Sequence, residues 1–136
     1  MISDRSEWDA FLTDHRWGVL TTLRASGSAV SSVVAYARDG DALVISTPGG
    51  TFKRRSLERD PRATLCVITN SEPFNFVSVE GHITIETDDL VRSTRRVFQN
   101  IAGTGYEEPA DLPGWLAAQS RVILRLIPER VYGVIR

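Results

Sequence analysis

Short hydrophobic runs separated by turn-forming pairs fill the N-terminal half of the chain. Three of these runs, 17–24, 29–38 and 42–47, are rich in β-branched residues. Ser26-Gly27 and Asp39-Gly40 lie between them, and such pairs favour tight turns between strands. The pattern predicts an antiparallel meander of three strands.

Further strands are predicted over 63–69, 74–87 and 121–135. Within 74–87 the residues alternate between two faces, as expected for a strand with one buried side. Gly81 interrupts the alternation, which indicates either a β-bulge or the close approach of another backbone. One face carries Val77, Val79, Ile83 and Ile85, and the other carries Phe76, Ser78, Glu80 and His82.

Helical spacing is confined to short segments. A first helix is expected to begin near Ser3 as its N-cap, and a second is expected over 51–59, where Thr51 precedes it and Asp60-Pro61 ends it. The apolar face of the first helix consists of Trp8, Phe11 and Leu12.

Two more helices are expected in the C-terminal half. Asp88 or Asp89 is expected to cap the third helix, and a short fourth helix lies around Trp115 after the loop 102–114. The apolar positions of the third helix, at helical spacing, are Leu90, Val91, Thr94, Val97, Phe98 and Ile101.

Six strands with a few small helices predict a mainly β fold, a small antiparallel barrel that is closed or partly closed. The strands do not alternate with helices, so a parallel, Rossmann-type sheet is not expected. A length of 136 residues matches a single domain, 1–136.

Composition changes this picture mainly by exclusion. A formal net charge of −1 argues against a nucleic-acid binder. The apolar runs are too short for a membrane helix, and the N-terminal residues lack the apolar core of a signal peptide. We therefore expect a cytoplasmic protein that binds neither nucleic acid nor membranes.

The chain lacks the common motifs of nucleophilic and metal-dependent catalysis. It contains no HExxH, no GxSxG and no P-loop. His15 and His82 do not have metal-ligand spacing, and we expect structural or exposed roles for them. Cys66 is the only cysteine, which excludes an internal disulfide, and we expect a buried, inert thiol.

The most informative segment is 46–55, where a strand ends, a glycine-rich turn follows, and a helix begins with Lys53, Arg54 and Arg55. Cations at a helix N-terminus cost up to about 1 kcal/mol each because of the macrodipole. A bound phosphate would offset that cost and accept the free N–H groups of the first turn. The alternative is a solvated basic face balanced by later acidic residues. Lys53 is the only lysine among 16 cationic side chains, and its compact ammonium group suits a phosphate.

Two other features are compatible with a ligand. In 29–38 the hydroxyl residues Ser31 and Ser32 interrupt a core-like strand; either a flat heteroaromatic ring lies against this edge or they are ordinary surface serines. Phe74 and Phe76 either form one wall of an apolar pocket or belong to the core. The face of 29–38 that contains Ser32 also carries Val30, Val34 and Tyr36.

The order and spacing of several segments resemble the pyridoxamine-phosphate-oxidase-like split-barrel superfamily. Within it, the chain is most similar to the deazaflavin branch, enzymes that use coenzyme F420 and are typical of actinobacteria. The similarity covers about 120 residues, and no single motif decides it. The matching segments are GVLTTLRASGSAVSSVVAY, ALVISTPGGTFKRRSLERDPRATLCV, VSVEGHITI, NIAG and RVILRLIPERVYG.

The resemblance implies a six-stranded, Greek-key, antiparallel split barrel. It also implies a homodimer with a cofactor at each of two sites in the subunit interface. Lys53 and Arg55 would bind the cofactor phosphate, and Trp115 and Arg121 are expected to reach the partner's site. The other cofactor-binding positions that it implies are Ser32, Val33, Val34, Ser46, Thr47, Gly50, Phe52, Phe74 and Phe76.

The function implied is hydride transfer between reduced F420 and an unsaturated small-molecule acceptor, chemistry that needs no protein nucleophile or metal. One alternative is an FMN-dependent oxidase or flavin reductase, although the tail RLIPERVYGVIR lacks the tryptophan typical of those oxidases. Another is a non-catalytic protein that carries a flavin, a deazaflavin or haem. Ser56 replaces a common Asn, and Val33 and Ala35 replace larger or polar residues, which leaves the acceptor open.

Overall fold

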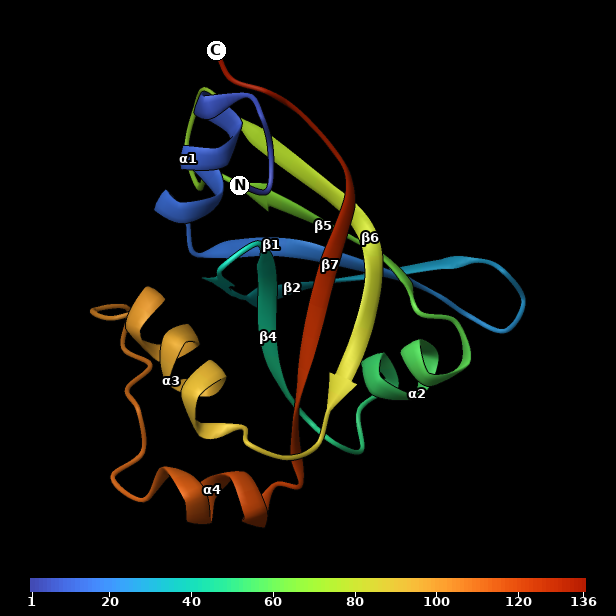
Figure 1. Ribbon diagram of the computed structural model, residues 1–136, viewed down its shortest axis with the longest axis vertical. Coiled ribbons are helices and arrows are strands. Elements are labelled where there is room, and N and C mark those ends of the chain that lie inside the picture. The colour runs from blue at the N-terminus through green and yellow to red at the C-terminus, as the bar shows by residue number, and fades with distance from the viewer.

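The computed structural model describes residues 1–136 and contains seven strands and four helices. Figure 1 shows the strands curling into a half-barrel, with the helices around it. The strands are β1 (Trp17–Leu23), β2 (Ala29–Ala35), β3 (Ala37–Asp39), β4 (Ala42–Pro48), β5 (Arg62–Ile68), β6 (Phe76–Glu86) and β7 (Arg121–Val134). The helices are α1 (Ser6–Asp14), α2 (Phe52–Arg59), α3 (Val91–Asn100) and α4 (Leu112–Ala118).

All strands belong to one antiparallel sheet in the order β2-β1-β5-β6-β7-β4-β3. β2 and β3 follow each other along the chain but lie at opposite edges of this sheet. The sheet therefore curls until its two edges approach one another, without a continuous ladder across the seam. The mainly β, antiparallel split-barrel prediction is confirmed, with seven strands in place of six.

The additional strand arises because 29–38 breaks at Tyr36. The Tyr36 side chain is fully buried, and its hydroxyl donates to the Leu12 carbonyl at 2.6 Å. The Tyr36 amide donates to the Arg16 carbonyl, and the Asn100 side chain donates to the Tyr36 carbonyl. The Arg16 bond continues the β1–β2 register by one residue, whereas the Tyr36 carbonyl is bound by a side chain of α3. The predicted three-stranded meander is therefore wrong, and two hairpins, β1–β2 and β3–β4, stand in its place.

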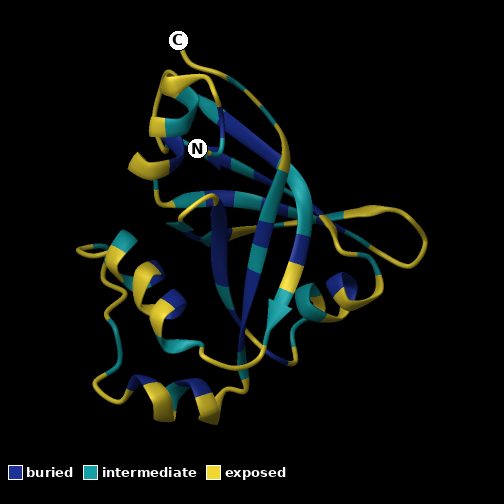
Figure 2. Ribbon diagram, in the orientation of Figure 1, coloured by how far each residue is buried: buried dark blue, intermediate teal, exposed yellow.

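The barrel interior holds the main hydrophobic core. Leucine, isoleucine and valine side chains from β1, β4, β5, β6 and β7 fill it, and Figure 2 shows the buried positions concentrated on these strands. At Gly81 the β6–β7 register shifts, and an added Cβ would lie 2.0 Å from the Ile127 carbonyl oxygen. Both interpretations of Gly81, a bulge and a close backbone approach, are confirmed.

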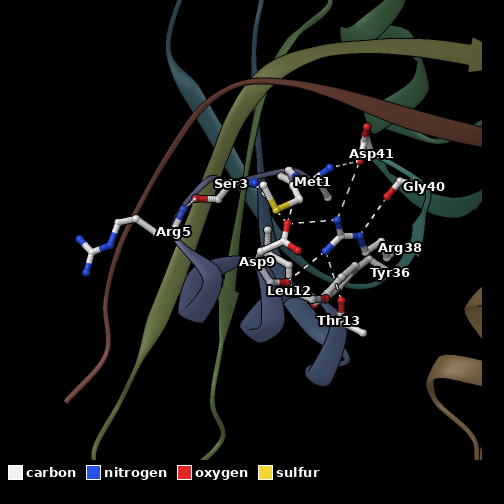
Figure 3. Close-up of polar contacts among 11 residues, drawn as sticks. Met1, Ser3, Arg5, Asp9, Leu12, Thr13, Tyr36, Arg38, Gly40 and Asp41 are labelled. Atoms are coloured by element: carbon white, nitrogen blue, oxygen red, sulfur yellow. Dashed lines mark hydrogen bonds and ion pairs between the residues drawn. The ribbon is translucent and has the colours of Figure 1, made fainter.

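α1 packs Phe11 and Leu12 into this core, as predicted. Ser3 does not cap it, because the helix begins later, with Arg5 at the cap position and no side-chain cap bond. The Asp9 carboxylate instead accepts the Ser3 amide and pairs with Arg38 of β3 at 3.1 Å. This pairing lowers the Asp9 pKa. Figure 3 shows the Arg38 guanidinium joining α1 to the β3–β4 hairpin.

α3 lies against the outer side of β3 and β4, and α4 lies near the beginning of β7 (Figure 1). Neither Asp88 nor Asp89 caps α3, since Leu90 holds the cap position without a side-chain bond; Asp89 has a φ of 51°, outside the extended geometry of a capping residue. The other two predicted helices are confirmed, with Thr51 capping α2 and Asp111 capping α4. No helix has the length and apolarity of a membrane span.

One end of the contact between α3 and the sheet is closed by an ion cluster around Asp39. Its carboxylate binds Arg92 through two hydrogen bonds of 2.8 and 2.9 Å, and it binds Arg125 at 2.9 Å. Arg96 lies 3.4 Å away, and Arg125 also reaches Glu86 at 3.0 Å. The Asp39 side chain is only 10% exposed. Hydrogen bonds from these arginines, above all from Arg92, lower the pKa of the Asp39 carboxyl group to about 2.

Candidate functional site

The main candidate site is a cleft of about 510 Å³ at the seam of the barrel. β3 pairs with β4 only as far as Ala37 and Val44, whereas β4 continues along β7 to Pro48. The end of β4 thus has one edge without a partner strand, opposite the free edge of β2. Backbone groups on an open edge remain available to a ligand. Strand residues of the cleft are Val33, Val34, Ala35, Ile45, Ser46, Thr47 and Pro48.

The opposite side of the cleft comes from α3, the loop that follows it, and α4. Apolar residues of α3 and Trp115 of α4 face the strands, with Phe98 and Trp115 in edge-to-face contact at 5.7 Å. The Arg95–Glu108 ion pair fastens the loop to α3. This side of the cleft is mainly apolar, and Glu107 is its one carboxylate. Its apolar and aromatic residues are Val97, Phe98, Ile101, Tyr106, Pro109 and Trp115.

Lys53 projects from the first turn of α2 into the cleft. Thr51 caps this helix by accepting the Arg54 amide, while the earlier amides of the turn have no helical acceptor. Of the three consecutive cations, Arg54 pairs with Glu58 at 2.9 Å. Lys53 and Arg55 form no ion pair. The two cations that the resemblance assigns to a phosphate are therefore those without a carboxylate partner.

Arg121 begins β7 directly beside Pro48 of β4 and also lines the cleft. Its guanidinium stacks on the Trp115 ring at 4.2 Å, and Nη1 donates to Gln119 at 3.0 Å. It has no carboxylate partner, and burial lowers its pKa. Trp115 and Arg121, expected to reach the partner's site, thus already share one cleft with Lys53 within a single chain.

Lys53 also borders a second, smaller cavity of about 210 Å³. Ser32 of β2 and Phe52 of α2 line it, so these two predicted residues lie next to the main cleft. Gly50 and Arg55 are exposed and line neither space. The alternation predicted for 29–38 is confirmed along β2, where Val34 is buried and Val33 is 68% exposed. It ends at the break, since Tyr36 and Ala37 are both buried.

Phe74 and Phe76 lie away from the cleft within one chain. They border a separate hollow of about 510 Å³ together with Cys66. Neither is a core residue, since Phe74 is 61% exposed and Phe76 is half-buried. Cys66 is half-buried, short of the full burial predicted, and burial raises its pKa, which fits an inert thiol.

The two histidines lie outside the cleft. His15 stacks on Phe11, with ring centroids 3.7 Å apart, and its Nδ1 lies 2.8 Å from the Phe11 carbonyl oxygen. His82 lies 2.7 Å from the exposed Glu129 carboxylate. These contacts agree with the structural and exposed roles predicted for them, and the chain holds no cluster of potential metal ligands.

Comparison with known proteins identifies the family. The sequence pattern that defines the pyridoxamine 5'-phosphate oxidase family matches residues 5–135. The chain belongs to this family. No curated protein matches the chain significantly.

Solved structures share the fold of this pyridoxamine 5'-phosphate oxidase family member. A conserved hypothetical protein from Mycobacterium tuberculosis is 22% identical, with a TM-score of 0.80 over 96% of this chain and 84% of that one. An F420 reductase is 23% identical, with a TM-score of 0.73 over 91% and 94%. An FAD-binding protein from Mesorhizobium loti is 21% identical, with a TM-score of 0.71 over 96% and 94%.

The sequence did not reveal the wall formed by α3 and the 105–109 loop. Val97, Phe98 and Ile101 were expected as the apolar face of a helix, and Val97 does contact the sheet core. The sequence did contain one signal for this wall. The helix carries more apolar residues than its contact with the sheet requires, and two of them, Phe98 and Ile101, line the cleft. The loop itself was recognised only as a loop.

Proposed function

We propose that the cleft binds a phosphate-bearing deazaflavin, F420, and that the protein transfers a hydride between reduced F420 and an unsaturated organic acceptor. The observation that carries the proposal is Lys53, which points without an acidic partner into an apolar cleft at an open strand edge. The residues fit such a cofactor because the Ser46 hydroxyl oxygen is also buried without a hydrogen-bond partner. The family membership and an F420 reductase of the same fold support this assignment.

When bound, the deazaflavin supplies the hydride chemistry. Lys53 and Arg55 would neutralise the phosphate, aided by the positive end of α2. Ser46 and the open edge of β4 would offer hydrogen bonds to polar edges of the ring system, in the manner of polar groups that orient a ligand in an apolar pocket. The apolar residues of α3 and Trp115 would exclude water from the reacting face.

We further propose that the protein works as a homodimer with the cofactor at the interface. The outer sheet face carries a row formed by Val33, Val19, Cys66, Ser78 and Tyr132 across neighbouring strands. Within this row Ser78 is buried, and Val19 and Cys66 are half-buried. The exposed large hydrophobics are Val33 and Tyr132, with Phe74 beside the row, and exposed apolar side chains gathered on one face are typical of an interface. Phe74 and Phe76 would then approach the partner's cleft. Light scattering should give twice the chain mass, and a monomer would contradict the shared site.

Parallel titrations with F420 and FMN test the cofactor. Both cofactors carry a phosphate that the site can bind, so the test is which of the two binds more tightly. We expect F420 to bind with micromolar affinity and more tightly than FMN. FMN retained through purification, with flavin absorbance, would favour an FMN-dependent oxidase or flavin reductase instead. Tight F420 binding without turnover across a broad panel of acceptors would indicate a carrier.

A further inference from the structure

Only five of the 16 cationic side chains are half-buried, and their partners separate them into two groups. Arg38, Arg54 and Arg125 each pair with a carboxylate. Lys53 and Arg121 have none, and both line the seam cleft. Glu107 lines the same cleft, and Asp88 and Asp89 line a groove beside Arg121, but none of them forms an ion pair with either cation. An anionic ligand would supply the close counter-charge that both positions lack.

Lys53 and Arg121 line the same cleft, and each also borders a hollow that the other does not reach. Lys53 also borders the small cavity beside Ser32 and Phe52, which Arg121 does not reach. Arg121 in turn borders a groove between α4 and the turn before α3, which Lys53 does not reach. Arg121 therefore has surroundings of its own in addition to those it shares with Lys53.

The backbone around Arg121 is fixed by close contacts. A Cβ on Gly49 would lie 2.2 Å from the Ser120 carbonyl oxygen, so the glycine turn packs directly against the residue before Arg121. Trp115 supports the flat side of the guanidinium, and Gln119 accepts from Nη1. The Arg121 Nε is buried without a partner. Nη2 also makes no hydrogen bond and is not among the fully buried atoms, so it is the unused donor of this oriented guanidinium that a ligand in the cleft can reach.

We propose that Arg121, supported by Trp115, forms a second anion subsite of the cleft that binds the carboxylate of an apolar, planar molecule. An N–H of Nη2 and the second N–H of Nη1 can donate in parallel to the two oxygens of a carboxylate. The apolar neighbours Phe98 and Ile101 favour a single charge on a flat hydrophobic body over a strongly hydrated dianion. The subsite stands on these contacts alone. The proposed function enters only in the source of the carboxylate, which belongs either to the acceptor or to the tail of the cofactor.

Cinnamate and its neutral analogue cinnamamide test the subsite in the full chain without cofactor. Calorimetry or ligand-observed NMR should show that the wild type prefers cinnamate by about tenfold or more, as expected for a charge-assisted pair. Arg121→Gln should remove this preference, and Arg121→Lys should keep part of it. Arg130→Gln is the matched control, because Arg130 lies on the same strand, exposed and without an ion pair. This variant should prefer cinnamate over cinnamamide as strongly as the wild type does.

Three results would overturn the subsite. The first is equal binding of cinnamate and cinnamamide by the wild type, or binding of neither. The second is a preference that survives in folded Arg121→Gln but disappears in Lys53→Gln. The third is an equal loss of affinity of Arg121→Gln for F420, FMN and inorganic phosphate, which would make Arg121 part of the phosphate site. Circular dichroism establishes that each variant is folded.

Titration of Arg121→Gln with F420 and FMN identifies the source of the carboxylate. Unchanged affinity for both cofactors assigns the carboxylate to the acceptor. A loss of about tenfold for F420 alone assigns it to the carboxylate-bearing tail, which FMN lacks. If the wild type binds neither cofactor but keeps the cinnamate preference, the proposed function fails and the subsite stands.

Discussion

Arg121 and Arg125 lie four residues apart on the same face of β7, and their surroundings are opposite. Arg125 contacts Asp39, Glu86 and Ser93 at the closed end of the contact between α3 and the sheet. Arg121 lies at the open end, beside Trp115 and the cleft, without a carboxylate. The same residue type on one strand thus fastens a helix at one end and, we propose, binds a ligand at the other.

The ion-pair partners of a cation therefore indicate its role better than its charge does. Fifteen arginines and a single lysine first suggest only a general bias toward arginine. After the paired and exposed cations are removed, Lys53 and Arg121 remain, and both line one cleft. We expect the closed end to govern stability and the open end to govern ligand binding.

The largest expected effect is at the closed end. Asp39→Asn removes the carboxylate that joins Arg92 to Arg125 and leaves Arg125 with Glu86 alone. It should lower the free energy of unfolding by about 3 kcal/mol, the lower part of the range for broken buried pairs. Urea denaturation measures this change. Asp41→Asn is the control on the same hairpin, since Asp41 is 74% exposed and should cost about 0.5 kcal/mol or less. Equal stability of the two variants would contradict the assignment of the Asp39 cluster to stability.

Acid should weaken the same end. The pKa of Asp39 is lowered to about 2 in the folded protein, so its contribution is present above the ordinary pKa near 4 and is lost as the pH falls toward 2. The wild type should lose about 2 kcal/mol across this interval that Asp39→Asn does not lose. Denaturation at several pH values measures both proteins, and parallel pH profiles would exclude this role for Asp39.

At the open end, the shape of the Lys53 ammonium group should affect cofactor affinity in addition to its charge. Lys53→Arg keeps the charge but replaces a compact ammonium group with a planar fork. We expect F420 affinity between those of the wild type and Lys53→Ala, with the free energy of unfolding unchanged within about 0.5 kcal/mol. Unaltered affinity of Lys53→Arg would mean that the lone lysine is accidental.

The smallest effect is expected for Arg54, the cation of the same turn that is already paired. Arg54→Gln removes a partly exposed pair with Glu58, which is worth about 0.5 kcal/mol or less. Cofactor affinity should remain close to that of the wild type in the fluorescence titration. A loss as large as that of Lys53→Ala would show that pairing does not separate structural from binding cations.

The sequence predicted most elements because local signals determine them. Thr51 before α2, Gly81 in β6 and the alternation in β2 each appeared as expected. The break at Tyr36 could not be predicted, because the Leu12 and Asn100 partners that hold it are distant in the sequence. The same break opens the edge of β4 and thereby creates the cleft.

The candidate site was likewise predicted only where a local segment of the sequence determines it. Lys53, Ser46 and Thr47 belong to a recognisable strand–turn–helix segment, and the structure brings them into one cleft. The α3 wall depends on how the helix docks, which its periodicity does not specify. Phe74 and Phe76 lie apart from the cleft in one chain, so their predicted contact with cofactor depends on the proposed dimer.

A fluorescence titration of F420 against three proteins tests the central claim most directly: the wild type, Lys53→Ala from the open end and Arg92→Ala from the closed end. We expect micromolar binding by the wild type, binding weaker by about tenfold or more in Lys53→Ala, and unchanged binding in Arg92→Ala. No fluorescence change with the wild type at tens of micromolar protein, or equal affinity of Lys53→Ala and the wild type, would contradict it.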